Sequence, residues 1–323
     1  MLAVYATRVS REDPLSGLEV GERPRPDVPD GWTRVRVRAA GLNHHDLWSL
    51  RGVGLSSDRL PMILGCDAAG VDDDGSEVVV HAVISDPGWR GDETLDPRRS
   101  LLSERYAGTL AEEVVVPRRN VVPKPAGLSF VEAACLPTAW LTAYRMLFTR
   151  SGLAPGTTVL VQGAGGGVAT ALIRLASSTG YRVWVTSRDE EKRARALELG
   201  ADAVFGPGAR LPERVDGVMD TVGAATWSHS LKSLRPGGVL VIAGATSGYT
   251  PDSGELNRVF FLQLKVVGST MGTRDELDRL VRLCGTTGVR PVVDSVLPLA
   301  SARDGFARML AGDLVGKVVF TCP

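Results

Sequence analysis

A glycine-rich turn between an apolar run and a helical run constrains the fold more than any other feature of the sequence. The run TTVLVQ (157–162) is followed by GAGGG and then by the helical pattern VATALIRLASST. Such a turn lets the backbone approach the pyrophosphate of a dinucleotide, whose charge lies at the N-terminus of the helix. The frame AxGxxA, with Ala164, Gly166 and Ala169, fits better than GxGxxG. A plain turn between a strand and a helix remains the alternative.

Strands and helices alternate after this turn, whereas both ends of the chain are rich in short strands. Between 123 and 286 the apolar runs are short and β-branched, as in YRVWVTS, which is typical of parallel strands covered on both faces. The chain ends show the alternation of half-buried strands, as in TRVRVRA. We therefore predict an α/β protein with a doubly wound parallel sheet domain at 123–286. A β-rich domain, 1–122, is completed by 287–323. Ser129 and Glu132 form a capping box that predicts a helix start.

The charge balance and the cysteine pattern limit the partners and the compartment. Lys plus Arg and Asp plus Glu number 37 each, so neither nucleic acid nor an anionic membrane is an expected partner. The four cysteines form no CxxC pair, which argues against a disulfide framework and a structural zinc lobe. The N-terminus lacks a signal-peptide pattern, and no apolar run approaches the ~20 residues that span a bilayer. We expect a cytoplasmic protein that binds a small molecule.

The end of the second strand after the glycine turn indicates the type of dinucleotide. NAD-binding chains usually carry an acidic residue there, about 20 residues after the turn, for the ribose hydroxyls. Here the strand ends in VTSRDEEK, so that Thr186 and Ser187 are followed by Arg188 and Lys192. Hydroxyl, guanidinium and ammonium groups together suit a 2′-phosphate, and Asp189 is better placed as a helix cap. NADPH is the predicted cofactor, with a solvated helix start as the alternative for the two basic residues.

Sequence blocks in a fixed order resemble those of a known superfamily. They include GLNHHDLWSLRG, LPMILGCDAAG, AACLPTAWLTAYR, VLVQGAGGGVA, LRPGGVLVIAG and GKVVF. On these blocks the chain resembles the medium-chain dehydrogenase/reductase superfamily, on its zinc-free quinone oxidoreductase side. The resemblance implies a GroES-like domain from the two chain ends and a Rossmann domain between them. It also implies hydride transfer from NADPH to a quinone, an enone or a similar activated double bond.

By the same resemblance, Asn43 falls where zinc-dependent members have their first cysteine ligand. Cys66 and Asp67 fall on their His–Glu pair, and Pro137 falls on a further ligand. No ligand type is kept unchanged, whereas a catalytic zinc needs three protein ligands, so no metal is expected. A zinc-type alcohol dehydrogenase with atypical ligands drawn from the adjacent histidines, Cys66 and Asp67 stays an alternative. A catalytically silent protein that binds NADPH as a sensor or scaffold is another.

Candidate catalytic residues lie in the block GLNHHDLWSLRG. The resemblance places Asn43 and Asp46 at the nicotinamide pocket and His45 at the position of a proton-relay hydroxyl. Without zinc, a hydrogen-bond donor such as Asn43, a histidine or water must stabilise the oxygen that gains charge. An imidazole also donates protons, although a structural role for His45 is the alternative. Because His44 and His45 are adjacent, an extended backbone would point them opposite ways.

The two remaining histidines are expected to be structural. His81 lies in a predicted strand and His229 in a predicted helix. The apolar segment GELNRVFFLQLKVVGS (254–269) lies where relatives pair as homodimers, with a locally covered edge strand as the alternative. The residues expected to contact the cofactor are Thr142, Ala164, Gly166, Gly167, Val168, Ser187, Arg188, Lys192, Val222, Gly244, Ala245, Ser269 and Lys317.

Overall fold

The computed structural model describes residues 1–322, which form two compact units. The β-rich unit contains Met1–Leu141 and the chain from Gly272 onward, and the parallel-sheet unit contains Thr142–Met271. These borders differ from the predicted ones at 122/123 and 286/287. The difference arises because α2 (Phe130–Ala133) and α8 (Arg274–Thr287) pack against strands of the β-rich unit.

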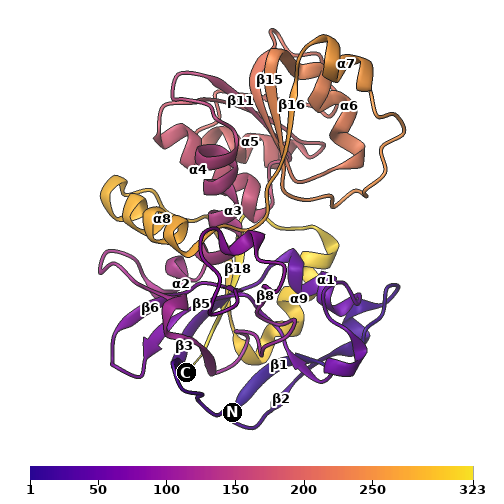
Figure 1. The fold of residues 1–323 in the computed structure, drawn as a ribbon. Helices are drawn as coiled ribbons and strands as arrows, with labels where there is room; N and C mark the ends of the chain where they lie inside the picture. Colours follow the sequence, from indigo (N-terminus) through magenta and orange to yellow (C-terminus); the bar gives the residue numbers. More distant parts are fainter. Residues whose placement is uncertain (323) are drawn as a thin grey trace. The chain divides into compact units, whose positions relative to one another are not determined.

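The β-rich unit is built on a sheet of seven strands, drawn with its helices in Figure 1. Six strands follow the order β10-β6-β5-β3-β18-β17, and β9 pairs with β3. Their bounds are β10 Val121–Pro123, β6 Glu77–Val80, β5 Asp67–Asp72, β3 Trp32–Gly41, β18 Lys317–Thr321, β17 Val293–Pro298 and β9 Glu113–Pro117. Smaller sheets join β2 (Leu18–Glu22), β1 (Leu2–Ala6) and β4 (Met62–Ile63), and pair β7 (Val83–Ile84) with β8 (Ser100–Leu101). The helices of this unit also include α1 (His44–Leu50) and α9 (Ala302–Ala311).

The C-terminal strand β18 completes this sheet from the far end of the chain. It pairs antiparallel with β3, Val319 opposite Gly41, and parallel with β17. On β3 the buried residues alternate with more exposed ones, as the sequence predicts. The pairing confirms that both chain ends build one β-rich fold. It also brings Lys317, the first residue of β18, beside the residues that follow β3.

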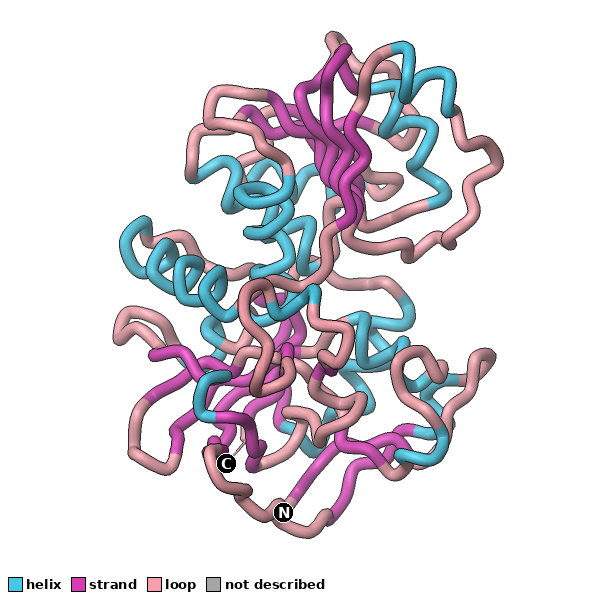
Figure 2. Tube along the Cα trace, in the orientation of Figure 1, coloured by secondary structure: helices cyan, strands magenta, loops and turns pink. Residues whose placement is uncertain are grey.

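The parallel-sheet unit has six parallel strands in the order β13-β12-β11-β14-β15-β16. Helices lie on both faces of this sheet, α4 and α5 on one and α6 and α7 on the other (Figures 1 and 2). The predicted doubly wound fold is therefore confirmed. The strands are β13 Ala203–Phe205, β12 Arg182–Thr186, β11 Thr158–Gln162, β14 Val215–Asp220, β15 Leu234–Ile242 and β16 Lys265–Gly268. The helices are α4 Gly167–Ser178, α5 Glu190–Glu198, α6 Ala224–Ser233 and α7 Leu256–Phe261.

The strand order of this unit reverses at β11, the kind of point at which open α/β sheets bind ligands. From β11 the chain moves outward to β12 and β13, and it then returns to β14 on the other side of β11. At such a reversal the loops at the carboxyl ends of the strands separate and leave a crevice for a dinucleotide.

Helical backbone begins at the predicted capping box and continues through two wider π turns. Ser129 Oγ accepts from the backbone N–H of Glu132, whose carboxylate accepts from the N–H of Ser129, which confirms the predicted start. After α2 come a π turn at Leu136–Trp140, α3 (Leu141–Tyr144) and a second π turn at Arg145–Arg150. No helix in residues 1–322 has the length and apolar character needed to cross a bilayer.

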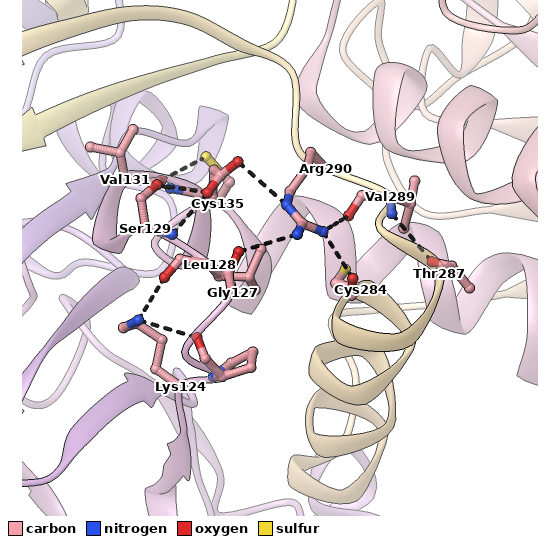
Figure 3. A network of polar contacts seen from close by, with 12 residues as sticks. Lys124, Gly127, Leu128, Ser129, Val131, Cys135, Cys284, Thr287, Val289 and Arg290 are labelled. Atoms are coloured by element: carbon pink, nitrogen blue, oxygen red, sulfur yellow. Dashed lines mark hydrogen bonds and ion pairs between the residues drawn. The ribbon is translucent and has the colours of Figure 1, made fainter.

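Arg290 ties the end of α8 to the start of α2 within the β-rich unit (Figure 3). Its guanidinium donates to the carbonyls of Cys284 and Gly127 and lies 3.6 Å from the Glu132 carboxylate. The nearby Lys124 ammonium donates to the Leu128 carbonyl. The Arg290 contacts hold α8 in the β-rich unit, which accounts for the shifted border.

Candidate active site

Asn43 lies where β3 gives way to helix α1, and Asp46 fixes this connection. Asp46 Oδ2 accepts a hydrogen bond of 2.8 Å from the backbone N–H of Asn43, and Oδ1 accepts one of 2.9 Å from Gly65 N–H. The Asp46 side chain is fully buried, and burial raises its pKa to about 7. Asp46 was expected to line the nicotinamide pocket. In the structure it joins the turn before α1 to the turn before Cys66 and Asp67.

The turn that presents Asp67 requires glycine at position 65. Gly65 has a φ of +102°, and a Cβ at this position would lie 2.5 Å from Thr109 Oγ1 and 2.7 Å from Leu110 N. Thr109 Oγ1 donates to the carbonyl oxygen of Asp67 at 2.9 Å. A side chain at position 65 would therefore displace the segment that carries Asp67.

The ammonium of Lys317 lies at the centre of this site. It donates to Leu42 O at 2.6 Å, to Asn43 Oδ1 at 2.5 Å and to Asp67 Oδ2 at 2.9 Å. These three acceptors match the three hydrogens of an ammonium group. The side chains of Lys317 and Asp67 are 3% and 0% exposed. Lys317 was expected from the resemblance to line the cofactor pocket, but its hydrogens are all used inside the β-rich unit.

The residues at the positions expected for a metal do not fit a zinc ion. Asn43 and Asp67 share the Lys317 ammonium, and the Cys66 thiol donates to the carbonyl of Leu102 at 3.2 Å. Across residues 1–322, no group of three or more His, Cys, Asp or Glu side chains is arranged to hold a metal. The Lys317 ammonium already lies between Asn43 Oδ1 and Asp67 Oδ2, so a divalent ion would have to displace it.

Two residues of the segment that follows α2 were not recognised as candidates in the sequence. Burial raises the pKa of the Cys135 thiol to about 12, with smaller opposing effects from the nearby charges of Lys317 and Asp67. Thr138, the neighbour of Pro137, has a buried hydroxyl oxygen with no hydrogen-bond partner within the described part of the chain. The AACLPTAW block was the available signal, but its alignment singled out Pro137, which has no polar side chain.

Both adjacent histidines belong to α1, so their backbone is helical and not extended as expected from the sequence. His45 Nε2 lies 3.5 Å from Ser49 Oγ and 4.0 Å from Glu104 Oε1. Burial lowers the pKa of His45 to about 4, so the ring is neutral at pH 7. A neutral, mostly buried ring favours the structural alternative over proton donation.

The histidines outside α1 are held by hydrogen bonds to the protein. His81 is buried, and its Nε2 lies 2.9 Å from the carbonyl oxygen of Gly272. His229 Nδ1 contacts Gln162 and its Nε2 contacts the carbonyl of Ala209, each at 2.9 Å. These contacts agree with the structural roles expected from the sequence.

In the parallel-sheet unit, the glycine turn leaves the start of α4 open. Gly166 is the N-cap residue of this 12-residue helix, and no atom lies within 4 Å of a Cβ built on it. Within residues 1–322, no side chain accepts a hydrogen bond from the first N–H groups of α4, which include those of Gly167 and Val168. Free N–H groups at a helix N-terminus bind anions, so this end fits the pyrophosphate of a dinucleotide.

At the end of β12, the residues predicted to bind the ribose differ in burial. Thr186 is buried and donates to Gln162 Oε1 at 2.5 Å, so its hydroxyl is used inside the sheet. Asp189 Oδ1 accepts from Lys192 N–H at 3.0 Å, which confirms the predicted cap of α5. Arg188 is exposed and makes no hydrogen bond or ion pair with the rest of residues 1–322. Its guanidinium is therefore available to an added phosphate.

Most other predicted cofactor positions gather at the carboxyl ends of the parallel strands. Asp220 Oδ1 accepts from the N–H groups of Val222 and Gly223 and orders the loop after β14. A Cβ on Gly223 would lie 2.7 Å from Ala245 Cα, so the loops after β14 and β15 touch. The residues that follow these strand ends are Ala164 after β11, Ser187 after β12, Val222 after β14, Gly244 and Ala245 after β15, and Ser269 after β16. Thr142, by contrast, is a buried residue of α3.

A β-rich unit with a buried polar site and a doubly wound unit with a dinucleotide turn together define the class of two-domain nicotinamide-dependent oxidoreductases. Family models agree: "Alcohol dehydrogenase GroES-like domain" matches residues 29–126, and "Zinc-binding dehydrogenase" matches residues 167–286.

Curated relatives and solved structures extend this match over the whole chain. An alcohol dehydrogenase of Geobacillus stearothermophilus is 31% identical, covering 94% of this chain and 95% of the relative. An acryloyl-coenzyme A reductase of Sulfurisphaera tokodaii is 28% identical, covering 95% and 97%. Among solved structures, an NAD-dependent alcohol dehydrogenase has a TM-score of 0.92 at 36% identity and covers 100% of both chains. A 2-octenoyl-CoA carboxylase reductase in complex with NADP has a TM-score of 0.89 at 26% identity, covering 99% and 87%. The chain belongs to the medium-chain dehydrogenase/reductase superfamily of oxidoreductases.

Proposed function

We propose that this protein is an NADPH-dependent reductase of an activated double bond that works without catalytic zinc. The substrate class is an enone or an enoyl thioester, with a quinone as the second class of acceptor. The observation that carries the proposal is the Lys317 ammonium bonded to both Asn43 and Asp67, the two oxygen-bearing residues at the expected metal positions. With an ammonium there, a substrate oxygen has to be stabilised by a hydrogen-bond donor and not by a Lewis acid.

Asn43 is the donor that the geometry favours. Its Oδ1 is occupied by Lys317, so its amide nitrogen is the end that remains for a substrate oxygen. NADPH, when bound, supplies the hydride to the β-carbon of the substrate. Negative charge then develops on the carbonyl oxygen, where an Asn43 N–H stabilises it, and the α-carbon takes a proton from water. His45 is assigned a structural role because its ring is neutral and buried at pH 7.

The residues at the end of β12 support the proposed preference for NADPH. No acidic side chain stands at the strand end, and the exposed Arg188 guanidinium follows Ser187 there. A guanidinium donates two parallel hydrogen bonds to a phosphate. The adenosine ribose of NADP carries a 2′-phosphate, whereas that of NAD does not. The NADP complex of the carboxylase reductase and the acryloyl-CoA reductase both agree with a reductase, whereas the alcohol dehydrogenase neighbour is NAD-dependent.

An acceptor screen tests the proposal. Purified protein is mixed with NADPH or NADH and with a cyclic enone, a short enoyl-CoA thioester, a benzoquinone or an aldehyde, and the loss of absorbance at the nicotinamide band is followed. We expect turnover with NADPH and an unsaturated carbonyl or quinone. Tight NADPH binding without turnover on any acceptor would instead support the sensor or scaffold alternative. Aldehyde reduction that depends on bound zinc would support the zinc-type alternative.

We also propose that the protein forms a homodimer through the edge of the parallel sheet. Strand β16 is the last strand of this sheet, and α7 before it exposes Leu256, Phe260 and Phe261 at 74%, 72% and 80%. Apolar patches of this kind mark interaction sites. The variant Phe260→Glu with Phe261→Glu is expected to be monomeric by light scattering, whereas a monomeric wild-type protein would favour the alternative of a plain edge strand.

A further inference from the structure

We propose that Lys317 is a positioning residue for catalysis. Its ammonium holds the Asn43 carboxamide so that an Nδ2 hydrogen is presented to the substrate oxygen. This inference rests on the proposed function, since it explains how the site stabilises a developing oxyanion without a metal. It assigns to Lys317 a role different from the cofactor contact that the resemblance implies.

The bond between Lys317 and Asn43 fixes which end of the amide faces the substrate. An ammonium has only donors, so the amide atom that lies 2.5 Å from it has to be the oxygen. The amide nitrogen is thereby turned away from Lys317. Its one bond within residues 1–322 is a long contact of 3.4 Å to Gly41 O. One of its two hydrogens therefore lacks an acceptor, although Asn43 is only 6% exposed.

The same bond strengthens Asn43 as a donor. A full positive charge on Oδ1 withdraws electron density from the amide, and hydrogen bonds in a chain polarise one another. Asp67 supplies the opposite charge at 2.9 Å and is completely buried, so the ammonium is neutralised without being exposed to water. The Leu42 carbonyl takes the third hydrogen. Lys317 is thus held on three sides, and Asn43 is held by Lys317.

A purely structural role is the competing explanation for Lys317. In that case the ion pair with Asp67 would only join β18 to β5 across β3, and Asn43 would be a bystander. The two explanations differ in one respect: a positioning role predicts that the catalytic effect of Lys317 is transmitted through Asn43.

A double-mutant cycle in kcat separates them. Asn43→Ala is expected to lower kcat by about 10²-fold or more, as does removal of an oxyanion donor in other enzymes. Lys317→Met is expected to lower kcat by a similar factor, with the NADPH dissociation constant unchanged within about twofold. Lys317→Arg, which keeps the charge, should restore part of the activity. In the Asn43→Ala background, Lys317→Met should change kcat by less than about threefold, because residues that act as a unit are not additive.

Lys124→Met is the matched control. Lys124 is also a buried lysine of the β-rich unit, bonded to Leu128 O at 2.6 Å and paired with Glu77 at 2.9 Å (Figure 3 shows its bonds to backbone carbonyls). Its substitution removes a buried ammonium outside the Asn43 site, so it should lower the melting temperature and leave kcat within about twofold.

Either of two kinetic outcomes would overturn the inference. One is additivity, in which Lys317→Met lowers kcat by the same factor with and without Asn43. The other is a folded Lys317→Met variant with wild-type kcat. If the wild-type protein reduces no acceptor, the proposed function fails, and crystals of Lys317→Met decide the role of Lys317 instead. The inference predicts a rotated Asn43 carboxamide in those crystals, and an unchanged orientation would refute it.

Discussion

Removing the Lys317 ammonium should destabilise the β-rich unit severely, because it leaves a fully buried carboxylate without a counter-charge. In Lys317→Met, Asp67 Oδ2 loses its ion pair, and Oδ1 already has no hydrogen-bond partner within residues 1–322. Breaking a buried pair from one side costs about 3–5 kcal/mol. Lys124→Met should cost less, about 1–2 kcal/mol, because its partner Glu77 is 50% exposed and is solvated again by water.

A second substitution tests whether the loss comes from the stranded charge. Lys317→Met combined with Asp67→Val removes both charges and should recover about 1–3 kcal/mol, since apolar replacements of a buried pair are often neutral. Hydrogen exchange of peptides from β3 and β18 reports the stability of the β-rich unit alone. The Leu42 amide, which donates to Val318 O, is a direct probe of the pairing of these strands. A Lys317→Met protein within about 1 kcal/mol of wild type, or a double variant less stable than the single one, would show that the unpaired Asp67 charge is not what destabilises the single variant.

Substitutions at Arg188, Gly65 and Asp46 test separate parts of the structure. Arg188→Ala should raise the KM for NADPH about 10–100-fold and leave the KM for NADH unchanged, which steady-state kinetics measure, because it removes a charge-assisted phosphate contact. Gly65→Ala should lower stability by more than about 2 kcal/mol in urea unfolding, because the residue has positive φ and its Cβ would overlap Thr109. The pKa of Asp46 is raised to about 7 in the folded protein, so the folded state binds more protons than the unfolded state between pH 4 and 7. Wild type should therefore lose stability relative to Asp46→Asn as pH rises through this window, and a pH-independent difference would contradict it.

The fold was predictable because its signals are local. Short β-branched runs, the glycine turn and the capping box at Ser129 each specify structure within a few residues, and the superfamily resemblance is confirmed by the family models. The domain borders were less accessible, because α8 is helical by its own sequence whichever unit it joins. Its attachment depends on Arg290, whose contacts reach back across the sequence to Gly127 and Glu132.

The buried polar site was only partly predictable from the sequence. Asn43, Cys66 and Asp67 were picked out by their positions, but Lys317 is separated from Asn43 by 274 residues and meets it through the pairing of β18 with β3. No local pattern reports that pairing. The role of Thr186 could not be predicted for the same reason. The sequence places its hydroxyl at a strand end, but its hydrogen bond to Gln162 depends on which strand lies beside it.

We propose that the Lys317 ammonium, and not a metal ion, organises the site for NADPH-dependent reduction. The most direct measurement combines metal analysis of the purified protein with its rate of NADPH-dependent enone or enoyl thioester reduction before and after treatment with a strong chelator. We expect no stoichiometric zinc and a rate that the chelator leaves unchanged. One zinc ion per chain, together with loss of the reaction on chelation, would contradict it.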